Sequence, residues 1–412
     1  MSQLKRVVVT GMAGISPMGT DWVSTLASLK AKQNFVEYIR EWDKFSGLNT
    51  RLGAPVKGFQ VPTSFPRKKV RSMGRVSRLA TVATQAALAD ADLIDHPVLT
   101  NGATGISYGS SVGSTEPFAA FGKMLNDGDC SGINATSYIK MMAHTTAVNL
   151  SLFFELKGRV HTTSSACTSG SQGIGYAYEA IKHGYQTVMV AGGAEELCPT
   201  EAVVFDTLYA TSLLNDTPTR SPRPFDQERD GLVIGEGAGT LILEELEHAQ
   251  QRGATIYAEL IGFGTNCDAM HVTQPTAETM QVAMELALND AGVSRDDVGY
   301  VCAHGTATER GDIAESQATA STFGRPIAIS SLKSYIGHTL GACGALEAWM
   351  SIEMMRTGWF APTINLDRVD ERCGELDYVT GNGRCIDTDL IMTNNFAFGG
   401  INTSLIFQRW PE

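Results

Sequence analysis

The sequence predicts an α/β protein with two similar halves, and two observations carry that prediction. Short apolar runs rich in β-branched residues, which are typical of buried strands, alternate with longer segments of helical periodicity. This alternation fills residues 1–253 and then resumes with a similar layout in residues 254–412. We therefore expect an N-terminal and a C-terminal α/β half with these bounds, related by an internal pseudo-duplication.

The first half opens with a β-branched run that ends at a glycine, which predicts a buried strand over residues 6–11. A helix is expected over residues 21–32, where Thr20 or Asp21 can act as the N-cap. Apolar runs and helical spacing place the other elements of this half: a strand and Gly/Ser loop at 103–115, a helix at 134–156, a helix from 173 onward, a strand at 187–193, a helix at 201–214, a strand at 240–243 and a helix that ends before Gly253.

The same patterns predict the elements of the second half: strands at 255–264, 298–303, 327–331, 391–393 and 403–407, and helices at 278–291 and 342–355. Ahead of it, residues 235–239 read Gly-Glu-Gly-Ala-Gly. This run lacks the lysine of a P-loop and the context of a dinucleotide fingerprint, so close backbone packing in a strand is the better interpretation.

The composition of the chain argues against several classes of protein, namely those that bind nucleic acids, metals or membranes. The 412 residues are 43% hydrophobic and 18% charged, which is ordinary for a globular protein with a large core. A net charge of −12 argues against nucleic-acid binding. Eight scattered cysteines without metal-ligand spacing suit a reducing cytosol and predict no metal site. With no signal peptide and no apolar stretch of membrane-spanning length, we expect a cytoplasmic protein that makes no contact with membranes.

A basic stretch stands out in this acidic chain. It is followed by apolar residues at helical spacing through Leu88, and it contains Arg67, Lys68, Lys69, Arg71, Arg75 and Arg78. The stretch could be a solvated helix face. Because its charge opposes that of the whole chain, it could equally recruit an anionic partner.

Residues 161–176 carry the most specific chemical signal. Cys167 lies between a strand-like segment and a helix, and its neighbours from Ala166 to Gly170 are small. Small neighbours would let a substrate carbonyl approach the sulfur, and a helix N-terminus would favour thiolate over thiol. A buried structural cysteine is the alternative.

Three further stretches place a reactive or donor group directly after a strand. They are residues 303–308 with His304, residues 330–338 with Lys333 and His338, and residues 394–402 with a Phe-Gly-Gly turn. Ligands bind at strand ends in open α/β sheets. A cysteine, two histidines and a lysine that converge there would form a nucleophilic site.

Together these four stretches resemble the β-ketoacyl-[acyl-carrier-protein] synthases, the condensing enzymes of fatty acid and polyketide synthesis, and in particular their elongating type II class. The similarity runs from the VVVTGM opening through PFD-x-x-RDG and GEGAG to the final F-x-FGG-x-N. It implies a thiolase-like fold with five layers, αβαβα, and a homodimer. It also implies no bound cofactor, because the phosphopantetheine arrives on an acyl carrier protein.

The resemblance implies a decarboxylative Claisen condensation in two half-reactions. Cys167 would take an acyl group from the carrier protein. Malonyl-carrier protein would then lose CO2, and its enolate would attack the acyl-cysteine to give a 3-oxoacyl product. His304 and His338 would donate hydrogen bonds to the enolate oxygen, with Lys333 nearby and held by Glu347.

Other roles also follow from the resemblance. The backbone N–H groups of Cys167 and Phe398 would form an oxyanion hole, and Phe398 would gate the acyl channel on the hinge of Gly399 and Gly400. The remaining matched positions are Val112 in the acyl pocket, Thr306 and Thr308 near the malonyl pantetheine, Asp312 and Glu315 as structural support, and Arg67, Lys68, Lys69 and Arg71 as the docking surface for the acidic carrier protein.

Several alternatives stay open at this point. A Cys–His hydrolase would not need the lysine motif, and a coenzyme A-dependent thiolase would be expected to carry a second active-site cysteine near the C-terminus, where this chain has Phe398. An inactive partner subunit would lack Cys167. The chain could still be the active half of a heterodimer with a chain-length factor, or a non-elongating interaction subunit.

At some positions the sequence departs from the pattern common in this family, for example at Glu309-Arg310-Gly311 and at Cys343. These departures indicate a specialised synthase, in a polyketide or aryl-polyene-like pathway.

Overall fold

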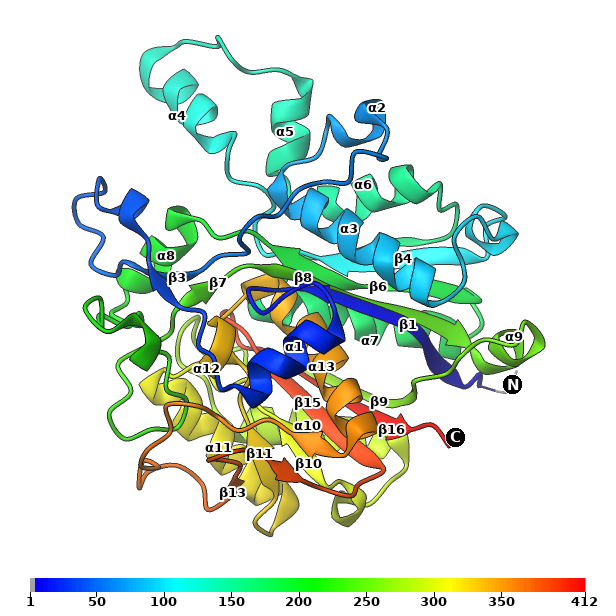
Figure 1. The fold of residues 1–412 in the computed structure, drawn as a ribbon, viewed down its shortest axis with the longest axis vertical. Coiled ribbons are helices and arrows are strands. Elements are labelled where there is room, and N and C mark those ends of the chain that lie inside the picture. The colour runs from blue at the N-terminus through cyan, green and yellow to red at the C-terminus, as the bar shows by residue number, and fades with distance from the viewer. Residues whose placement is uncertain (1–3, 412) are drawn as a thin grey trace.

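The computed structural model describes residues 4–411, and its main feature is one sheet of eleven strands (Figure 1). Five strands come from the first half, in the order β1-β8-β6-β4-β5. Their bounds are β1 Val7–Ile15, β4 Thr104–Gly109, β5 Val160–Thr163, β6 Val188–Glu195 and β8 Gly237–Glu245.

The second half repeats this arrangement in the order β9-β16-β15-β10-β11, with the short β13 added at the edge. Within each half the first two neighbouring pairs are antiparallel and the last two are parallel. The bounds are β9 Ala258–Cys267, β10 Tyr300–Cys302, β11 Ala328–Ser330, β13 Asp377–Tyr378, β15 Leu390–Phe396 and β16 Ile401–Arg409. The repeated order and direction are those of a pseudo-duplicated α/β fold. The exact division at residue 253 stays a prediction.

Three pairs of helices complete five layers (Figure 1). Helices α3 and α6 cover the outer face of the first half-sheet, α7 and α13 lie between the half-sheets, and α10 and α11 cover the outer face of the second. Their bounds are α3 Arg75–Asp90, α6 Thr145–Phe154, α7 Ser169–Lys182, α10 Ala277–Ala291, α11 Glu309–Phe323 and α13 Cys343–Thr357. Because α13 is enclosed by both half-sheets, every residue from Cys343 to Met355 is buried.

The apolar core follows these layers, with one large cluster between the half-sheets and one under each outer pair of helices. The remaining helices and strands are α1 Trp22–Lys30, β2 Glu37–Tyr38, β3 Leu52–Ala54, α2 Arg67–Val70, α4 Phe118–Asp127, α5 Ala135–Met141, α8 Pro199–Asp206, β7 Ile234–Gly235, α9 Leu246–Gln251, α12 Lys333–Ile336, β12 Trp359–Phe360 and β14 Arg384–Cys385. Short 3-10 turns are η1 Arg40–Trp42, η2 Pro97–Leu99, η3 Ala166–Thr168, η4 Pro218–Arg220, η5 Arg295–Asp297 and η6 Leu340–Ala342.

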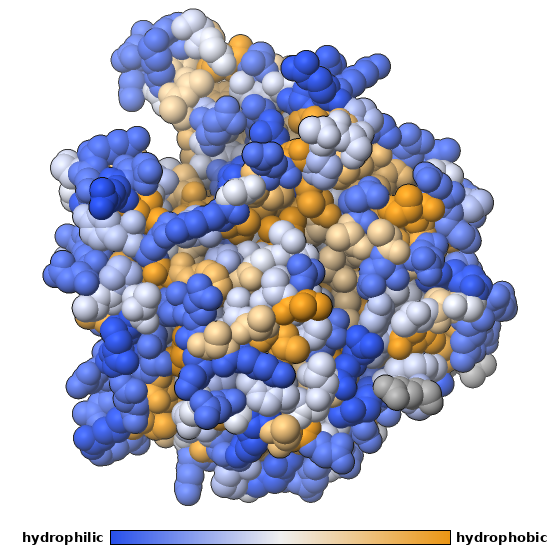
Figure 2. Space-filling view, in the orientation of Figure 1, coloured by the Kyte–Doolittle hydropathy of each residue, from blue (hydrophilic) through white to orange (hydrophobic). Residues whose placement is uncertain are grey.

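Helices α4 and α5 project from the layered body, and the space-filling view shows a notch beneath them (Figures 1 and 2). Helix α4 buries none of its residues, and Leu125 at its outer end is 79% exposed.

Among the residues that the structure describes, none of the helices combines the length and the apolar character that a membrane crossing requires.

Three expected helices differ from those observed. The basic segment forms two helices, α2 and α3, because Gly74 before α3 has an extended backbone (φ −77°, ψ −177°). The helix expected over 134–156 forms as α5 and α6. The helix expected over 201–214 ends at Asp206, because Tyr209 has a left-handed backbone (φ 55°).

The glycine run at 235–239 lies in β7 and at the start of β8, as expected from close packing. A Cβ atom on Gly235 would lie 2.2 Å from the carbonyl oxygen of Ile336. Only a residue without a side chain allows this approach between β7 and α12.

Candidate active site

Cys167 lies in the turn that joins β5 to α7. Ala166 has a left-handed backbone (φ 51°), which is strained for a residue with a Cβ atom. Ser169 closes the turn, because its hydroxyl donates to the Ala166 carbonyl (2.7 Å) and accepts from the Ser165 N–H (3.0 Å). Thr163, at the end of β5, donates its hydroxyl to the Ser169 carbonyl at 2.7 Å. The turn thus presents the sulfur at the wall of a cavity.

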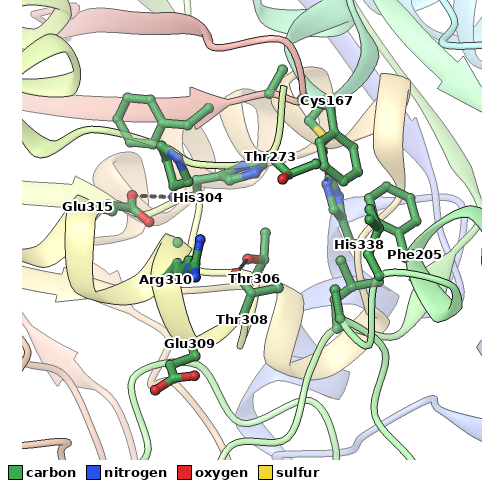
Figure 3. Close-up of a pocket in the computed structure, with 18 of the residues that line it drawn as sticks. Cys167, Phe205, Thr273, His304, Thr306, Thr308, Glu309, Arg310, Glu315 and His338 are labelled. Atoms are coloured by element: carbon green, nitrogen blue, oxygen red, sulfur yellow. Dashed lines mark hydrogen bonds between the residues drawn. The ribbon is translucent and has the colours of Figure 1, made fainter. Parts of the chain in front are cut away.

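The cavity has a volume of about 590 Å³ and lies where strands of both halves end. Cys167, His304 and His338 line it, together with Thr306 and Thr308 (Figure 3). The sulfur and one nitrogen from each histidine all lie within 4.8 Å of one another. The fold therefore brings together three of the four reactive groups that the motifs predict for one site.

His338 contacts the nucleophile candidate directly. Its Nε2 lies 2.9 Å from Cys167 Sγ, and its Nδ1 accepts the Leu340 N–H at 3.2 Å. Burial, and then the charge of Lys333, lowers the pKa of His338 well below its usual value, so the ring is neutral. Because Nδ1 acts as an acceptor, the single ring proton is on Nε2, which faces the sulfur.

His304 follows β10, and its backbone is fixed by a buried carboxylate. Glu315 on α11 accepts the N–H groups of His304 (2.6 Å) and Gly305 (2.7 Å), the first of which is drawn in Figure 3. The His304 and His338 rings meet edge to face with centroids 5.0 Å apart. Burial, and then the charge of Lys333, also lowers the pKa of His304. Its Nδ1 lies 3.4 Å from Asn395 Nδ2, which leaves the ring proton on Nε2.

Lys333 lies beneath the histidines, outside the cavity wall. Its ammonium donates to Glu347 on α13, and Asn395 Nδ2 donates to the other oxygen of Glu347 at 2.8 Å. Burial by itself would lower the pKa of Lys333, but Glu347 raises it above its usual value, so the lysine is charged. The sequence placed Asn395 in a motif without assigning it a role. Its two contacts link the ion pair to His304.

The electrostatics of Cys167 correct one expectation. A helix N-terminus was expected to favour the thiolate, but burial raises the pKa of Cys167 to about 11, so the resting side chain is a thiol. The backbone N–H groups of Phe398 and Cys167, and the charge of Lys333, act in the opposite direction. The effect of burial on the pKa is larger than these opposing effects, because only 4% of Cys167 is exposed. Both N–H groups nevertheless point at the sulfur.

Phe398 closes one side of the cavity. Its ring stacks on Phe205 of α8, with centroids 4.8 Å apart and planes 18° apart. Gly399 (φ 85°) and Gly400 (φ 74°) follow it with left-handed backbones. A Cβ atom on Gly400 would lie 2.7 Å from Asp268 Cβ, so this turn depends on glycine.

The loop after His304 completes the wall. The hydroxyls of Thr306 and Thr308 lie 2.9 Å apart. Asp312 accepts the N–H groups of Ala307 (3.1 Å) and Phe225 (2.7 Å), so it fixes the loop from behind, as Glu315 does.

Other expected site residues lie elsewhere. Val112 does not line this cavity. It follows Ser110 and Ser111, which both donate to the buried Glu195, a carboxylate that the sequence did not single out. Of the basic residues, Lys69 is bound to Glu155 and to the Phe153 carbonyl, whereas Arg67, Lys68 and Arg71 are exposed on and after α2.

The cluster of Cys167, His304 and His338 is also the only group in residues 4–411 whose side chains could hold a metal ion. Residue spacing along the chain could not reveal it, because each ligand atom comes from a different element. The charge of Lys333, which lowers the pKa of both histidines, opposes a cation here. The same charge favours an anionic intermediate.

Two family models match this chain. The β-ketoacyl synthase N-terminal domain matches residues 4–249, and the β-ketoacyl synthase C-terminal domain matches residues 257–367. The chain belongs to the β-ketoacyl synthase family. The predicted resemblance is thereby confirmed, and the first three of the four motifs lie within the matched ranges.

Individual β-ketoacyl synthases are similar over the whole length. The 3-oxoacyl-[acyl-carrier-protein] synthase 2 of Synechocystis sp. is 37% identical, over 98% of this chain and 98% of its own. A β-ketoacyl synthase structure from Burkholderia phymatum STM815 is 60% identical with a TM-score of 0.98, and the match covers 99% of this chain and 100% of that one. The ishigamide ketosynthase/chain length factor is 30% identical with a TM-score of 0.89, over 99% and 100% of the two chains. These matches confirm the thiolase-like fold.

Proposed function

We propose that this β-ketoacyl synthase catalyses the decarboxylative condensation of an acyl group on Cys167 with malonyl-acyl carrier protein, to give 3-oxoacyl-acyl carrier protein and CO2. The observation that carries the proposal is the grouping of Cys167, His304 and His338 around one cavity, with their reactive atoms within 4.8 Å. A hydrolase would need only one histidine, and this site has two, with a buried cation behind them.

In the first half-reaction, the sulfur of Cys167 attacks the thioester carbonyl of the acyl-phosphopantetheine. The Cys–S bond to the acyl carbon forms, the carrier thiol leaves, and the thiol proton of Cys167 passes to that leaving thiol. The N–H groups of Cys167 and Phe398 stabilise the oxyanion of the tetrahedral intermediate.

In the second half-reaction, the carboxylate of the malonyl thioester leaves as CO2, and its bonding electrons form a thioester enolate. The Nε2–H groups of His304 and His338 donate to the enolate oxygen, and Lys333 adds positive charge behind them. The enolate carbon forms a bond to the acyl carbonyl carbon, and the C–S bond to Cys167 breaks. The released thiolate then takes up a proton from solvent, which restores the resting thiol. Neutral, donating histidines suit this step because protonated ones would have to be formed against the charge of Lys333.

The acyl carrier protein supplies the phosphopantetheine arm, so the reaction needs no bound cofactor. We infer that α2 and the residue after it dock this acidic partner through Arg67, Lys68 and Arg71, whose side chains are exposed. Lys69 contributes less to docking, because Glu155 already pairs with it.

The eight free cysteines support a reducing, cytoplasmic setting.

We further infer that the protein works as a dimer built on β5. This strand is the edge of the sheet, and Val160 on it is 44% exposed. The apolar side chains of Leu125, Tyr138 and Ile139 are exposed on the projecting helices α4 and α5. The second subunit is a copy of this chain or a related chain-length factor, a pairing that the name of the ishigamide structure describes for that protein.

The test is intact-mass analysis of the protein after incubation with acyl-carrier proteins of different chain length, first without and then with malonyl-carrier protein. We expect a gain of one acyl group, absent in Cys167→Ala and retained in Cys385→Ala, which removes an exposed cysteine. Malonyl-carrier protein should then discharge the acyl group as a 3-oxoacyl product. Acylation without discharge would favour the interaction subunit, and absence of acylation would overturn the proposal for the isolated chain.

A further inference from the structure

Glu201 on α8 is a buried carboxyl group without a partner. Only 4% of the residue is exposed, and neither side-chain oxygen accepts or donates a hydrogen bond. Within residues 4–411 it is the only carboxyl group with both oxygens buried in this way. Nearby buried carboxylates are satisfied: Glu195 accepts from Ser110, and Glu236 accepts from Arg75. Native proteins rarely leave such a group unpaired, and a hydrogen-bonding ligand would satisfy the two oxygens of Glu201.

The surroundings of Glu201 favour its protonated form. Burial, followed by repulsion from Glu195 and from Cys198, Glu196 and Glu236, raises the pKa of Glu201 well above its usual value. A protonated carboxyl group offers one O–H donor and one carbonyl acceptor. It therefore complements a hydroxyl or a carbonyl oxygen better than it complements a cation or a hydrocarbon.

Helix α8 places Glu201 one turn from Phe205, a residue that borders the cavity at Cys167. Glu201 and Phe205 are four residues apart and share one face of the helix. Phe205 stacks on Phe398 and borders the cavity next to Cys167 (Figure 3). Glu201 itself does not line that cavity. It lies one helical turn before Phe205, the residue whose ring stacks on Phe398.

The other end of the same helix face meets the loop that carries Val112. Cys198, three residues before Glu201, accepts a hydrogen bond from Thr115 Oγ1 at 2.8 Å. Ser111 in this loop donates to Glu195, the carboxylate that repels Glu201 most strongly and that also raises the pKa of Cys167. Glu201 thus lies between the Phe398 gate and the Val112 loop.

We propose that Glu201 is the polar end of the acyl-binding channel, where its carboxyl group binds a hydroxyl or carbonyl oxygen on the acyl chain carried by Cys167. The inference rests on the proposed function, since it needs an acyl group on Cys167. It assigns a substrate class, namely an oxygen-bearing acyl chain rather than a plain hydrocarbon one. The chain reaches Glu201 when the Phe398 ring moves away from Phe205.

The experiment compares self-acylation rates of Cys167 with matched pairs of acyl-pantetheine thioesters, alkanoyl and ω-hydroxyalkanoyl, of increasing chain length. Free pantetheine thioesters are used so that carrier docking does not enter. We expect the wild type to prefer the hydroxylated member by about tenfold at one chain length, because a site built to bind a hydroxyl group rejects the analogue that lacks it. Glu201→Leu should remove that preference and accelerate acylation by the plain chain, and Glu201→Gln should retain part of it.

Val204→Ala, on the exposed face of the same helix, is the matched control and should behave as the wild type. Equal rates within every pair, or a preference that survives in Glu201→Leu and Glu201→Gln, would overturn the inference while leaving the nucleophile assignment intact. Variants that weaken dimer formation without changing the preference would also overturn it, because Glu201 would then pair with the second subunit. Absence of acylation by any donor would overturn the proposed function itself, and this inference with it.

Discussion

At the scale of single residues, the site separates the tasks of nucleophile, donors and charge. Cys167 is a resting thiol, the two histidines are neutral donors, and Lys333 is a buried positive charge that lowers the pKa of both histidines. Each protonation state follows from burial together with nearby charges or hydrogen bonds. The chemistry therefore depends on contacts that set protonation as much as on the reacting groups.

The first prediction concerns the thiol. Because burial raises the pKa of Cys167 to about 11, and only the thiolate reacts with alkylating agents, its alkylation by iodoacetamide should accelerate about tenfold for each pH unit up to that range. Rates are measured by mass spectrometry of the Cys167 peptide in the ligand-free protein. The exposed Cys385 in the same sample is the internal comparison. A rate plateau for Cys167 below pH 8 would contradict the assigned resting thiol.

The second prediction concerns Asn395, which donates to Glu347 and to Nδ1 of His304. In Asn395→Leu the His304 ring can take the other tautomer and turn its lone pair toward the enolate. Decarboxylation of malonyl-carrier protein should fall about tenfold, the effect of one lost hydrogen bond to a charged group, while acylation of Cys167 changes little. Asn395→Ser, which keeps a donor, should recover part of the rate. Equal losses in both half-reactions would indicate a merely structural role.

At the scale of elements, short turns and one small helix determine what reaches the site. The turn after Phe398 contains two left-handed glycines, and the basic side chains of α2 do not line the cavity. Neither contributes a reacting atom. Their effects should appear in stability, gating and affinity for the carrier protein.

The third prediction compares the two glycines. Gly399→Ala places a Cβ in open space and costs only backbone strain, about 1 kcal/mol of unfolding free energy. Gly400→Ala adds a clash with Asp268 Cβ and should cost about 3 kcal/mol. Urea unfolding measures both. Equal costs would mean that the Asp268 segment yields to the new methyl group.

The fourth prediction tests α2 as the docking element. Replacing Arg67, Lys68 and Arg71 together by Glu should raise the KM for acyl-carrier protein at least about tenfold and leave acylation by acyl-pantetheine unchanged. The salt dependence of the wild-type KM should shrink in the variant. Lys44→Glu, at an exposed lysine on another part of the surface, is the control. An unchanged KM would place the carrier protein elsewhere.

At the scale of the whole molecule, the sequence could predict the order of the elements but not the contacts between them. Strand-like runs and glycine-capped helices are local signals, so β1, α1 and α10 lie close to where they were expected. The contact of His338 with Cys167 joins residues 171 positions apart, and no local pattern contains it. Motif order, and the resemblance built on it, identified both residues. The raised pKa of Cys167 and the unpaired Glu201 depend on burial by other elements, which explains why both escaped sequence analysis.

The last prediction belongs to this scale, because the sheet has one exposed edge in the first half. Strand β5 pairs only with β4, so its outer edge presents unpaired backbone groups beside the exposed Val160. An edge strand can pair with another chain, and charged side chains are one device that opposes such pairing; β5 has no acidic residue or lysine in Val160–Thr163. A lysine placed there should therefore oppose pairing. We expect Val160→Lys to raise the dimer dissociation constant at least about tenfold in sedimentation equilibrium.

Val23→Lys is the matched control for that prediction, since Val23 is an exposed valine on α1, an element that pairs with no sheet edge. It should leave the dissociation constant unchanged. Dimer loss should also slow acylation of Cys167, because β5 leads directly into the turn that holds the sulfur, and a frayed edge would loosen the Thr163–Ser169 bond. A monomeric Val160→Lys that acylates at the wild-type rate would separate assembly from catalysis, and an unchanged dimer would place the interface on another surface.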